Sequence, residues 1–198
     1  MKERASILIV EDELITATSI RELLEEEDYR VTGIASSAAT ALRLCSQAEP
    51  VPAVVVCDIT IKGDVNGTEL AAQLKSLYGC EIIFLTAYTD NRTLQDAFSK
   101  DPVMYVVKPY SDTQLLVAVQ MAFFKLFNKE KNTNPGRLEL TEREKEIAEM
   151  VGMGLSSKQI GPKLGISIET VKTHRRRMLQ KNNISSFPHL IYLMNQES

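Results

Sequence analysis

The chain lacks most of the features that mark secreted, metal-stapled or membrane proteins. Its 198 residues include only three cysteines, Cys45, Cys57 and Cys80, an odd number without CxxC spacing. That usage argues against a disulfide framework or a zinc site, and cysteines in apolar surroundings are usually small core residues. No apolar run approaches the ~20 residues of a membrane span. With no signal-peptide pattern at the start, the sequence predicts a cytoplasmic protein without a membrane segment.

The charge is divided unevenly between the two parts of the chain. From Arg137 onward there are ten Lys and Arg against seven Asp and Glu, whereas the preceding residues hold 13 against 19. An acidic first part and a basic second part predict two domains with different partners. The basic part is a candidate to bind nucleic acid.

The first part alternates short apolar runs with segments of helical periodicity. Strands are expected at 6–10, 31–35, 53–57, 81–86 and 103–107, with helices between them, one of them capped by Asp90. The run from Glu25 to Asp28 is interpreted as the solvated end of the first helix. Strands that alternate with helices predict an α/β fold with a parallel sheet wound on both faces.

Residues with useful chemistry follow four of these strands. In such folds the functional crevice lies at the carboxyl ends of the strands. Taken singly, each residue has an ordinary explanation, such as a solvated turn or punctuation after a strand. Their order along successive strands instead favours one shared site, made of Glu11, Asp12, Asp58, Thr86 and Lys108.

The residue types of this site point to phosphoryl transfer. Clustered carboxylates without His or Cys favour Mg²⁺ over zinc or copper. The Asp58 carboxylate can accept a phosphoryl group as a covalent nucleophile. Lys108 would neutralise phosphate oxygens, and the Thr86 hydroxyl can donate to one of them. A phosphorylated aspartate would act as a switch.

Residues 5–127 resemble the receiver domain of two-component response regulators. The resemblance rests on Glu11-Asp12, Asp58, Thr86-Ala87, Tyr105 and Lys108-Pro109. It implies a flavodoxin-like five-stranded fold, and Mg²⁺ held at the acidic pair by Asp12, Asp58 and the backbone carbonyl of Thr60. It also implies phosphorylation of Asp58 by a sensor histidine kinase, a cis Lys108–Pro109 bond, and a Tyr105 ring that swings inward as Thr86 moves. Alternatively, Tyr105 is a half-buried strand aromatic.

The loop after Asp58 departs from the family pattern. It reads Ile59-Thr-Ile-Lys-Gly-Asp-Val-Asn-Gly67, without the usual proline and one residue longer. Tyr88, two residues after Thr86, is bulky. We hypothesise that it shields the phosphate from water and lengthens the phosphorylated state, which an unchanged dephosphorylation half-life in Tyr88→Ala would contradict.

The second part of the chain predicts a small all-α domain. Polar residues 128–137 end on Pro135-Gly136 and indicate a linker. From 138 to 198 four helices are expected, opened by a capping box at Thr141-Glu144 and by caps at Ser156 or Ser157, Ser167 and Ser186. The two middle helices form a helix-turn-helix.

The third of these helices concentrates basic residues. Val171, Met178 and Leu179 can pack inward, which leaves Lys172, Thr173 and Arg176 on a face that can enter the major groove of double-stranded DNA. Phosphate contacts are expected from Lys158, Arg175, Arg177 and Lys181. The alternative is a solvated basic face.

Three motifs in this domain resemble the LuxR/NarL-type DNA-binding domain: Leu140 to Ile147, Gly154 to Ile160, and Thr170-Val-Lys-Thr-His174. The resemblance implies that Thr170 and His174 contact DNA, whereas His174 alone could be a core or capping residue. Gly161-Pro162 departs from the family. Because proline removes a helical hydrogen bond, a kinked or shortened helix is expected there.

The sequence therefore predicts a DNA-binding response regulator that is not an enzyme. Its expected partners are double-stranded DNA, a sensor histidine kinase and a second copy of the chain, at least when phosphorylated. The alternative is a receiver-based protein interaction module whose C-terminal domain has lost DNA specificity. A phosphatase-like enzyme is disfavoured because no general acid stands near Asp58.

Overall fold

The first domain is built on a parallel sheet. The computed structural model describes residues 6–87, 102–130 and 138–197. Its sheet has five strands in the order β2-β1-β3-β4-β5, all paired in parallel. Each strand lies within one residue of its expected position: β1 Ser6–Val10, β2 Arg30–Ala35, β3 Val54–Asp58, β4 Glu81–Thr86 and β5 Met104–Val107.

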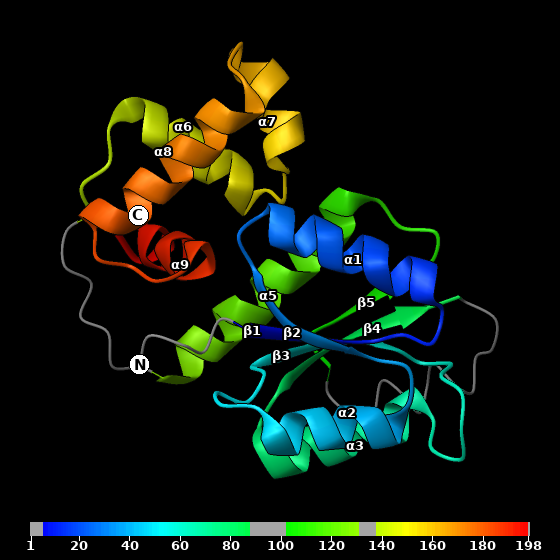
Figure 1. Ribbon diagram of the computed structural model, residues 1–198. Coiled ribbons are helices and arrows are strands. Elements are labelled where there is room, and N and C mark those ends of the chain that lie inside the picture. The colour runs from blue at the N-terminus through cyan, green and yellow to red at the C-terminus, as the bar shows by residue number, and fades with distance from the viewer. Residues whose placement is uncertain (1–5, 88–101, 131–137, 198) are drawn as a thin grey trace.

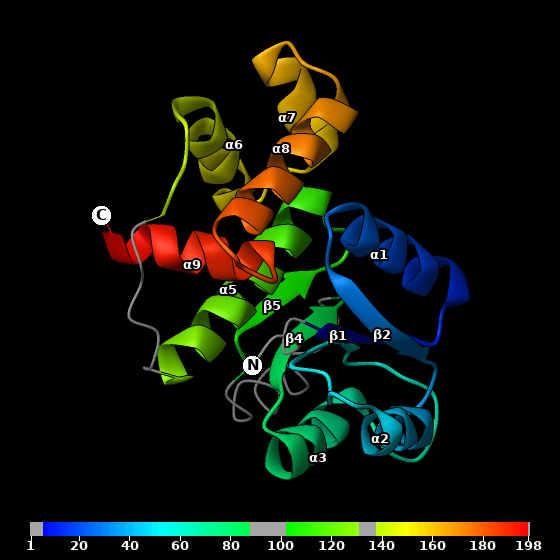
Figure 2. The ribbon, with the colours of Figure 1, turned by 60° about the vertical axis from the view of Figure 1, so that its left-hand side comes forward.

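Helices cover both faces of this sheet, as the sequence predicts. Helices α1 (Leu14–Glu26) and α5 (Asp112–Glu130) lie on one face, and α2 (Ala38–Gln47) and α3 (Gly67–Tyr78) lie on the other (Figures 1 and 2). Alternate strand residues feed the two cores, so Ile7 and Ile9 pack with α1 and α5. Leu8 and Val10 pack with α2 and α3. Tyr88 and the helix expected after Asp90 lie outside the described residues.

The second domain contains the expected four helices. They are α6 (Glu142–Gly152), α7 (Ser157–Leu164), α8 (Ile168–Lys181) and α9 (Phe187–Glu197). Thr141 forms the predicted capping box with Glu144, and Ser167 caps α8 by accepting from the backbone N–H of Thr170. Ile147, Val171 and Leu190 are fully buried in its core.

Helix α7 differs from the expected structure. It continues unbroken through Pro162 to Leu164 and is capped by Gly165, so the expected shortening is wrong. Pro162 removes only the hydrogen bond that its own nitrogen would give to Lys158, near the start of the helix. Gly161 has a separate role, because a Cβ there would lie 2.9 Å from the backbone oxygen of Ile166. The glycine lets the turn between α7 and α8 pass close to α7.

The two domains pack against each other through α5. This helix extends to Glu130, three residues past the expected end of the first domain at residue 127, and residues 131–137 lie outside the described part. Its aromatic side chains meet α9, where the rings of Phe127 and His189 stack with centroids 4.9 Å apart. Phe124 meets Tyr192 edge-on at 5.3 Å. Figure 2 shows α9 lying beside α5.

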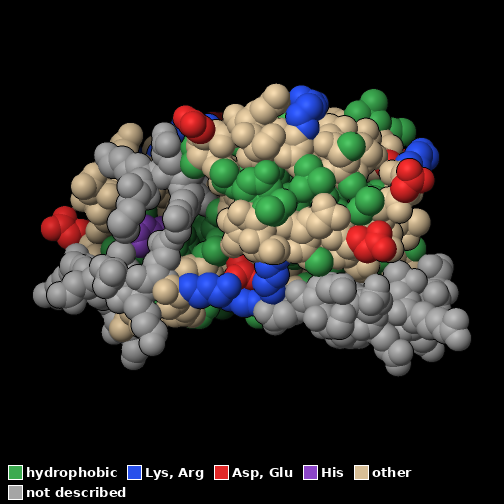
Figure 3. Space-filling model, turned by 90° about the horizontal axis from the view of Figure 1, so that it is seen from below, with side chains coloured by type: hydrophobic (Ala, Val, Ile, Leu, Met, Phe, Trp, Pro, Cys, Tyr) green, Lys and Arg blue, Asp and Glu red, His purple; other side chains and the backbone are tan. Residues whose placement is uncertain are grey.

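Several large apolar side chains lie on the surface of the described residues. Seen from the side that α2 and α3 cover, hydrophobic atoms form a band among polar ones (Figure 3). Leu14 and Ile15, at the start of α1, are 73% and 78% exposed. Among the described residues, no helix combines the length and the apolarity that crossing a bilayer demands.

Candidate functional site

The carboxyl ends of the strands bring the predicted acidic and basic residues together. Glu11 follows β1, and its backbone N–H donates to Ala35 at 3.0 Å. Asp58 is the last residue of β3. Lys108 follows β5, and its backbone N–H donates to the Thr86 oxygen at 2.7 Å. Main-chain hydrogen bonds of the sheet therefore hold each of these side chains at one edge.

Lys108 joins the two buried carboxylates of the site. Its Nζ lies 2.6 Å from Glu11 Oε2 and 2.6 Å from Asp58 Oδ2. Glu11 is 2% exposed and Asp58 is 8% exposed. Burial raises the pKa of Glu11, with the Asp58 charge adding to it, although Lys108 acts against the shift. Burial opposes the charged form of Lys108, but its hydrogen bonds to Asp58 and Glu11 prevail and raise its pKa.

The bond that follows Lys108 has the expected geometry. Lys108–Pro109 is cis, which confirms the prediction. Glu49–Pro50 is cis as well, which was not predicted.

The acidic cluster fits a magnesium ion. Glu11, Asp12 and Asp58 each offer a carboxylate oxygen, and these atoms lie within 4.8 Å of one another. An all-oxygen donor set with open positions is what Mg²⁺ prefers. The backbone N–H of Thr60 donates to Asp58 Oδ1 at 2.8 Å, which fixes the orientation of that carboxylate. In the loop that follows Asp58, the Lys62 Nζ lies 3.1 Å from Asp12 Oδ2.

The two expected switch residues lie on neighbouring strands beside this cluster. Thr86 ends β4 and is 6% exposed. The half-buried Tyr105 ring stacks on Phe84 with centroids 5.7 Å apart. Burial raises the pKa of Tyr105 to about 12, so the phenol stays neutral. This position fits both readings of Tyr105, the switch and the strand aromatic.

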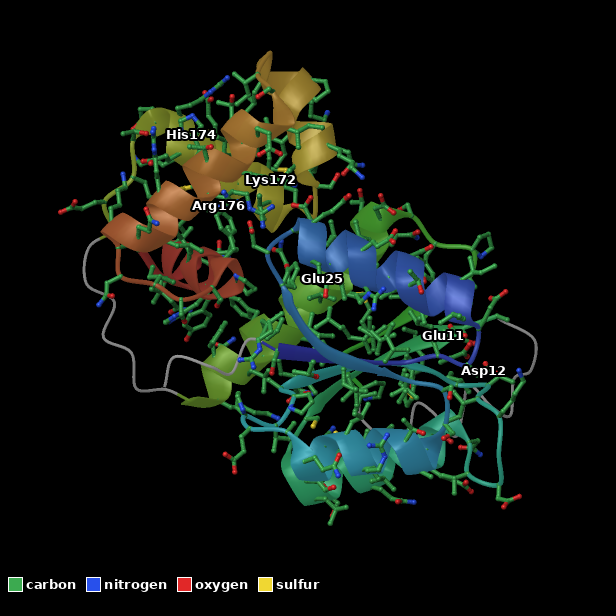
Figure 4. The ribbon with its side chains drawn as sticks, in the orientation of Figure 1. Glu11, Asp12, Glu25, Lys172, His174 and Arg176 are labelled. Atoms are coloured by element: carbon green, nitrogen blue, oxygen red, sulfur yellow. The ribbon has the colours of Figure 1, made fainter. Side chains whose placement is uncertain are left out.

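Most of the predicted DNA-contacting side chains share one exposed side of α8. Thr170, Thr173, Arg176 and Arg177 are exposed, and Lys172 and His174 are half-buried. Figure 4 shows Lys172, His174 and Arg176 along this helix, far from Glu11 and Asp12. Val171 and Met178 are fully buried on the opposite side, as the spacing predicts.

Three other predicted phosphate contacts have partners inside the protein. Lys181 Nζ donates to Glu144 at 2.5 Å. Lys158 pairs with Glu26 at 2.7 Å. Arg175 does not lie on the surface with its neighbours, since it is 1% exposed and donates to Glu27. Arg175 lies four residues after Val171 and three before Met178, a spacing that places it on the buried face of the helix. This spacing was the sequence signal for its burial.

The end of α1 also differs from expectation. The run from Glu25 to Asp28 was interpreted as a solvated helix end, but Glu27 is only 3% exposed. Its carboxylate accepts from the backbone N–H of Ser157 at 2.8 Å and from the Ser157 hydroxyl at 3.0 Å. For Glu27 this interpretation is wrong, because the second domain covers its carboxylate, whereas Glu25 and Asp28 are exposed as expected.

Comparisons with known proteins identify relatives of both domains. The model of the response regulator receiver domain matches residues 7–120, and that of bacterial regulatory proteins of the luxR family matches residues 138–194. The transcriptional regulatory protein TdiR of Thauera aromatica is 34% identical over 153 residues, covering 73% of this chain and 66% of TdiR. YdfI of Bacillus subtilis, also a transcriptional regulatory protein, is 26% identical over 199 residues, covering 91% and 90%. The solved structure of response regulator StyR is 28% identical with a TM-score of 0.53, covering 96% and 98%.

Proposed function

The chain belongs to the response regulators that carry a receiver domain and a luxR-family DNA-binding domain, and from this premise we propose that phosphorylation of Asp58 controls its action on DNA. The observation that carries the proposal is the contact of Lys108 Nζ with both Glu11 and Asp58 at 2.6 Å. It places a fixed positive charge where the oxygens of a phosphoryl group on Asp58 would lie.

The phosphoryl donor we propose is a phosphohistidine of a sensor kinase. An Asp58 carboxylate oxygen forms a bond to phosphorus as the phosphorus–nitrogen bond breaks, and the imidazole leaves with the electron pair. Asp12 and Asp58, with the Thr60 carbonyl and the nearby Glu11, would hold Mg²⁺, which when bound supplies positive charge to the transferring group. Lys108 neutralises the added charge, and the Thr86 hydroxyl donates to one phosphate oxygen.

The DNA contacts we propose come from the exposed side of α8. Lys172, Thr173 and Arg176 would reach base edges in the major groove. Thr170, His174 and Arg177 would contact the backbone, and Lys158 and Lys181 would do so when released from Glu26 and Glu144. Two copies of the chain would bind together, because one such module contacts few bases and linked half-sites multiply the affinity.

The test is footprinting on genomic DNA with and without a small phosphoryl donor and Mg²⁺. We expect wild-type protein to protect DNA more strongly after phosphorylation, and Asp58→Asn to show no response to the donor. Binding should fall steeply with salt, and both Lys172→Ala and Arg176→Ala should weaken it. Protection that is identical with and without the donor would contradict control through Asp58.

The alternative of an interaction module without DNA specificity has less support. Its hint in the sequence was Gly161-Pro162, yet α7 runs through Pro162 without interruption. Gly161 is accounted for by the close approach of the Ile166 carbonyl. Failure of Lys172→Ala and Arg176→Ala to change DNA affinity would favour this alternative.

A further inference from the structure

The loop between Asp58 and α3 places a second lysine at the acidic cluster. Lys62 Nζ lies 3.1 Å from Asp12 Oδ2, whereas Lys108 pairs with the other two carboxylates. The Lys62 side chain is 84% exposed, and that of Asp12 is 17% exposed. The cluster thus combines three carboxylates with two ammonium groups, one inside it and one at its solvent edge.

The packing of this loop fixes where the Lys62 side chain begins. Ile59 and Ile61 are buried in the core on the side of α2 and α3. The backbone N–H of Ile59 also donates to the Leu85 oxygen at 3.0 Å. Lys62 comes directly after the second buried isoleucine and before Gly63, whose φ of +120° is a conformation that glycine adopts readily. The sequence of the loop therefore directs this lysine to the cluster.

An ion that arrives from solvent meets Asp12 first. Figure 4 shows Glu11 and Asp12 together at the edge of the sheet. The side chains of Glu11 and Asp58 are 1% and 11% exposed, less than that of Asp12, and each lies 2.6 Å from Lys108 Nζ. A cation bound to the Asp12 carboxylate would lie close to the Lys62 ammonium, and the two positive charges would repel each other.

We propose that Lys62 is a built-in counter-ion of Asp12 that Mg²⁺ must displace, and that it thereby sets the Mg²⁺ affinity of the cluster. The inference rests on the proposed function, in which Asp12 is a ligand of the ion, and it names a residue that regulates binding at that site. The loop that carries Lys62 departs from the family pattern, so the device belongs to this chain.

Lys62 is the lysine that yields, because its contact is the weaker one. It forms an exposed pair with Asp12, whereas Lys108 bonds to two nearly buried carboxylates. Exposed ion pairs are worth at most about 1 kcal/mol, which corresponds to about fivefold in affinity. With both lysines in place the carboxylates still carry one excess negative charge, so the cluster continues to attract a cation. After the exchange the charges balance.

The test is a calorimetric titration of the full-length protein with magnesium chloride, without a phosphoryl donor. Lys62→Gln removes the ammonium and should bind Mg²⁺ about fivefold more tightly than wild type. Lys62→Arg keeps a cation that pairs with carboxylates, so its affinity should stay close to that of wild type. Lys145→Gln is the matched control. It removes the same charge from another exposed pair, with Glu142 at 3.0 Å on α6, and should leave Mg²⁺ affinity unchanged.

A second measurement follows the contact between Lys62 and Asp12 directly. A carbodiimide condenses a carboxylate with an amine that touches it, so protein without Mg²⁺ should yield an amide between these two residues, detected by mass spectrometry of peptides. Saturating Mg²⁺ should lower this yield severalfold. The amide between Lys145 and Glu142 should form to the same extent with and without the ion.

The outcomes separate this proposal from the proposed function. If Lys62→Gln binds Mg²⁺ no more tightly than Lys145→Gln, or as tightly as Lys62→Arg, the counter-ion proposal is wrong. It is also wrong if Mg²⁺ leaves the coupling of Lys62 to Asp12 unchanged. Circular dichroism checks that each variant is folded. If neither wild type nor Lys62→Gln binds Mg²⁺, the proposed magnesium site fails, and the role of Lys62 fails with it.

Discussion

Lys108 has two neighbours that would otherwise repel each other. Its Nζ separates the carboxylates of Glu11 and Asp58, both nearly buried. With Lys108→Met these charges lose their counter-charge, and we expect the free energy of unfolding to fall by about 1–3 kcal/mol. Because Mg²⁺ can supply the missing charge, adding it should restore more stability in the variant than in wild type. Urea unfolding with and without Mg²⁺ measures both effects.

A second lysine at the same cluster provides the control. Lys62 pairs with Asp12 at 3.1 Å, but its side chain is 84% exposed. An exposed pair is worth at most about 1 kcal/mol, so Lys62→Met should change stability little. Equal losses in the two variants would show that Lys108 has no special electrostatic role.

Glu144 stabilises the second domain in two ways. It completes the capping box with Thr141 and accepts from Lys181 at 2.5 Å. Glu144→Gln keeps the box and removes the ion pair, and we expect a loss of about 0.5–1.5 kcal/mol at neutral pH. Glu144→Ala removes both and should lose about 1 kcal/mol more.

The contribution of Glu144 should depend on pH in one direction. Burial would raise its pKa, but hydrogen bonds from Lys181 and Thr141 outweigh it, so the pKa lies below the ordinary 4.5. Because the pKa of Glu144 is lower in the folded state than in the unfolded state, its ionised carboxylate stabilises the fold fully at pH values above the unfolded-state pKa. This contribution is lost as the pH falls through the folded-state pKa. Urea unfolding in steps below pH 5 should show the wild-type advantage over Glu144→Gln shrinking. An advantage that grows with acidity would refute this.

Pro162 lies at an exposed position inside helix α7, and the helix does not depend on a proline there. Because α7 stays helical through Pro162, Pro162→Ala should restore one backbone hydrogen bond and raise the free energy of unfolding by up to about 3 kcal/mol. Lys163→Ala, on the same helix, controls for the general helix propensity of alanine. If both variants unfold at the same urea concentration, the proline carries no penalty here.

Secondary structure was largely predictable because each element has its own local signal. Continuous apolar runs such as Ile82 to Leu85 mark strands that are buried on both sides, and serine and threonine caps mark the helix starts. The carboxylate cluster followed from the same logic, since parallel strands end at one edge. Pro162 misled the prediction because a general penalty for proline in helices does not say whether a particular helix will bend or end.

Contacts between domains could not be predicted in the same way. Glu26 and Glu27 have the sequence pattern of a solvated helix end, and nothing nearby in the chain distinguishes them from Glu25. Arg175 sits at a position with core spacing, but its partner lies in the other domain. Local patterns predict which side a residue faces and carry no information on which distant surface covers it.

The contact between α5 and the turn after α6 offers a way to open the molecule without changing its charge. Gly154 has a φ of +82°, and a Cβ there would lie 2.4 Å from Val117 Cγ2. Gly154→Ala should therefore push the turn away from α5, in addition to a strain of about 1–2 kcal/mol from the left-handed backbone. We expect a larger radius of gyration in small-angle scattering. Adding Val117→Ala makes room for the new methyl group and leaves the backbone strain in place. Scattering that moves back toward wild type in the double variant would trace the opening to this clash, whereas no recovery would leave backbone strain as its cause.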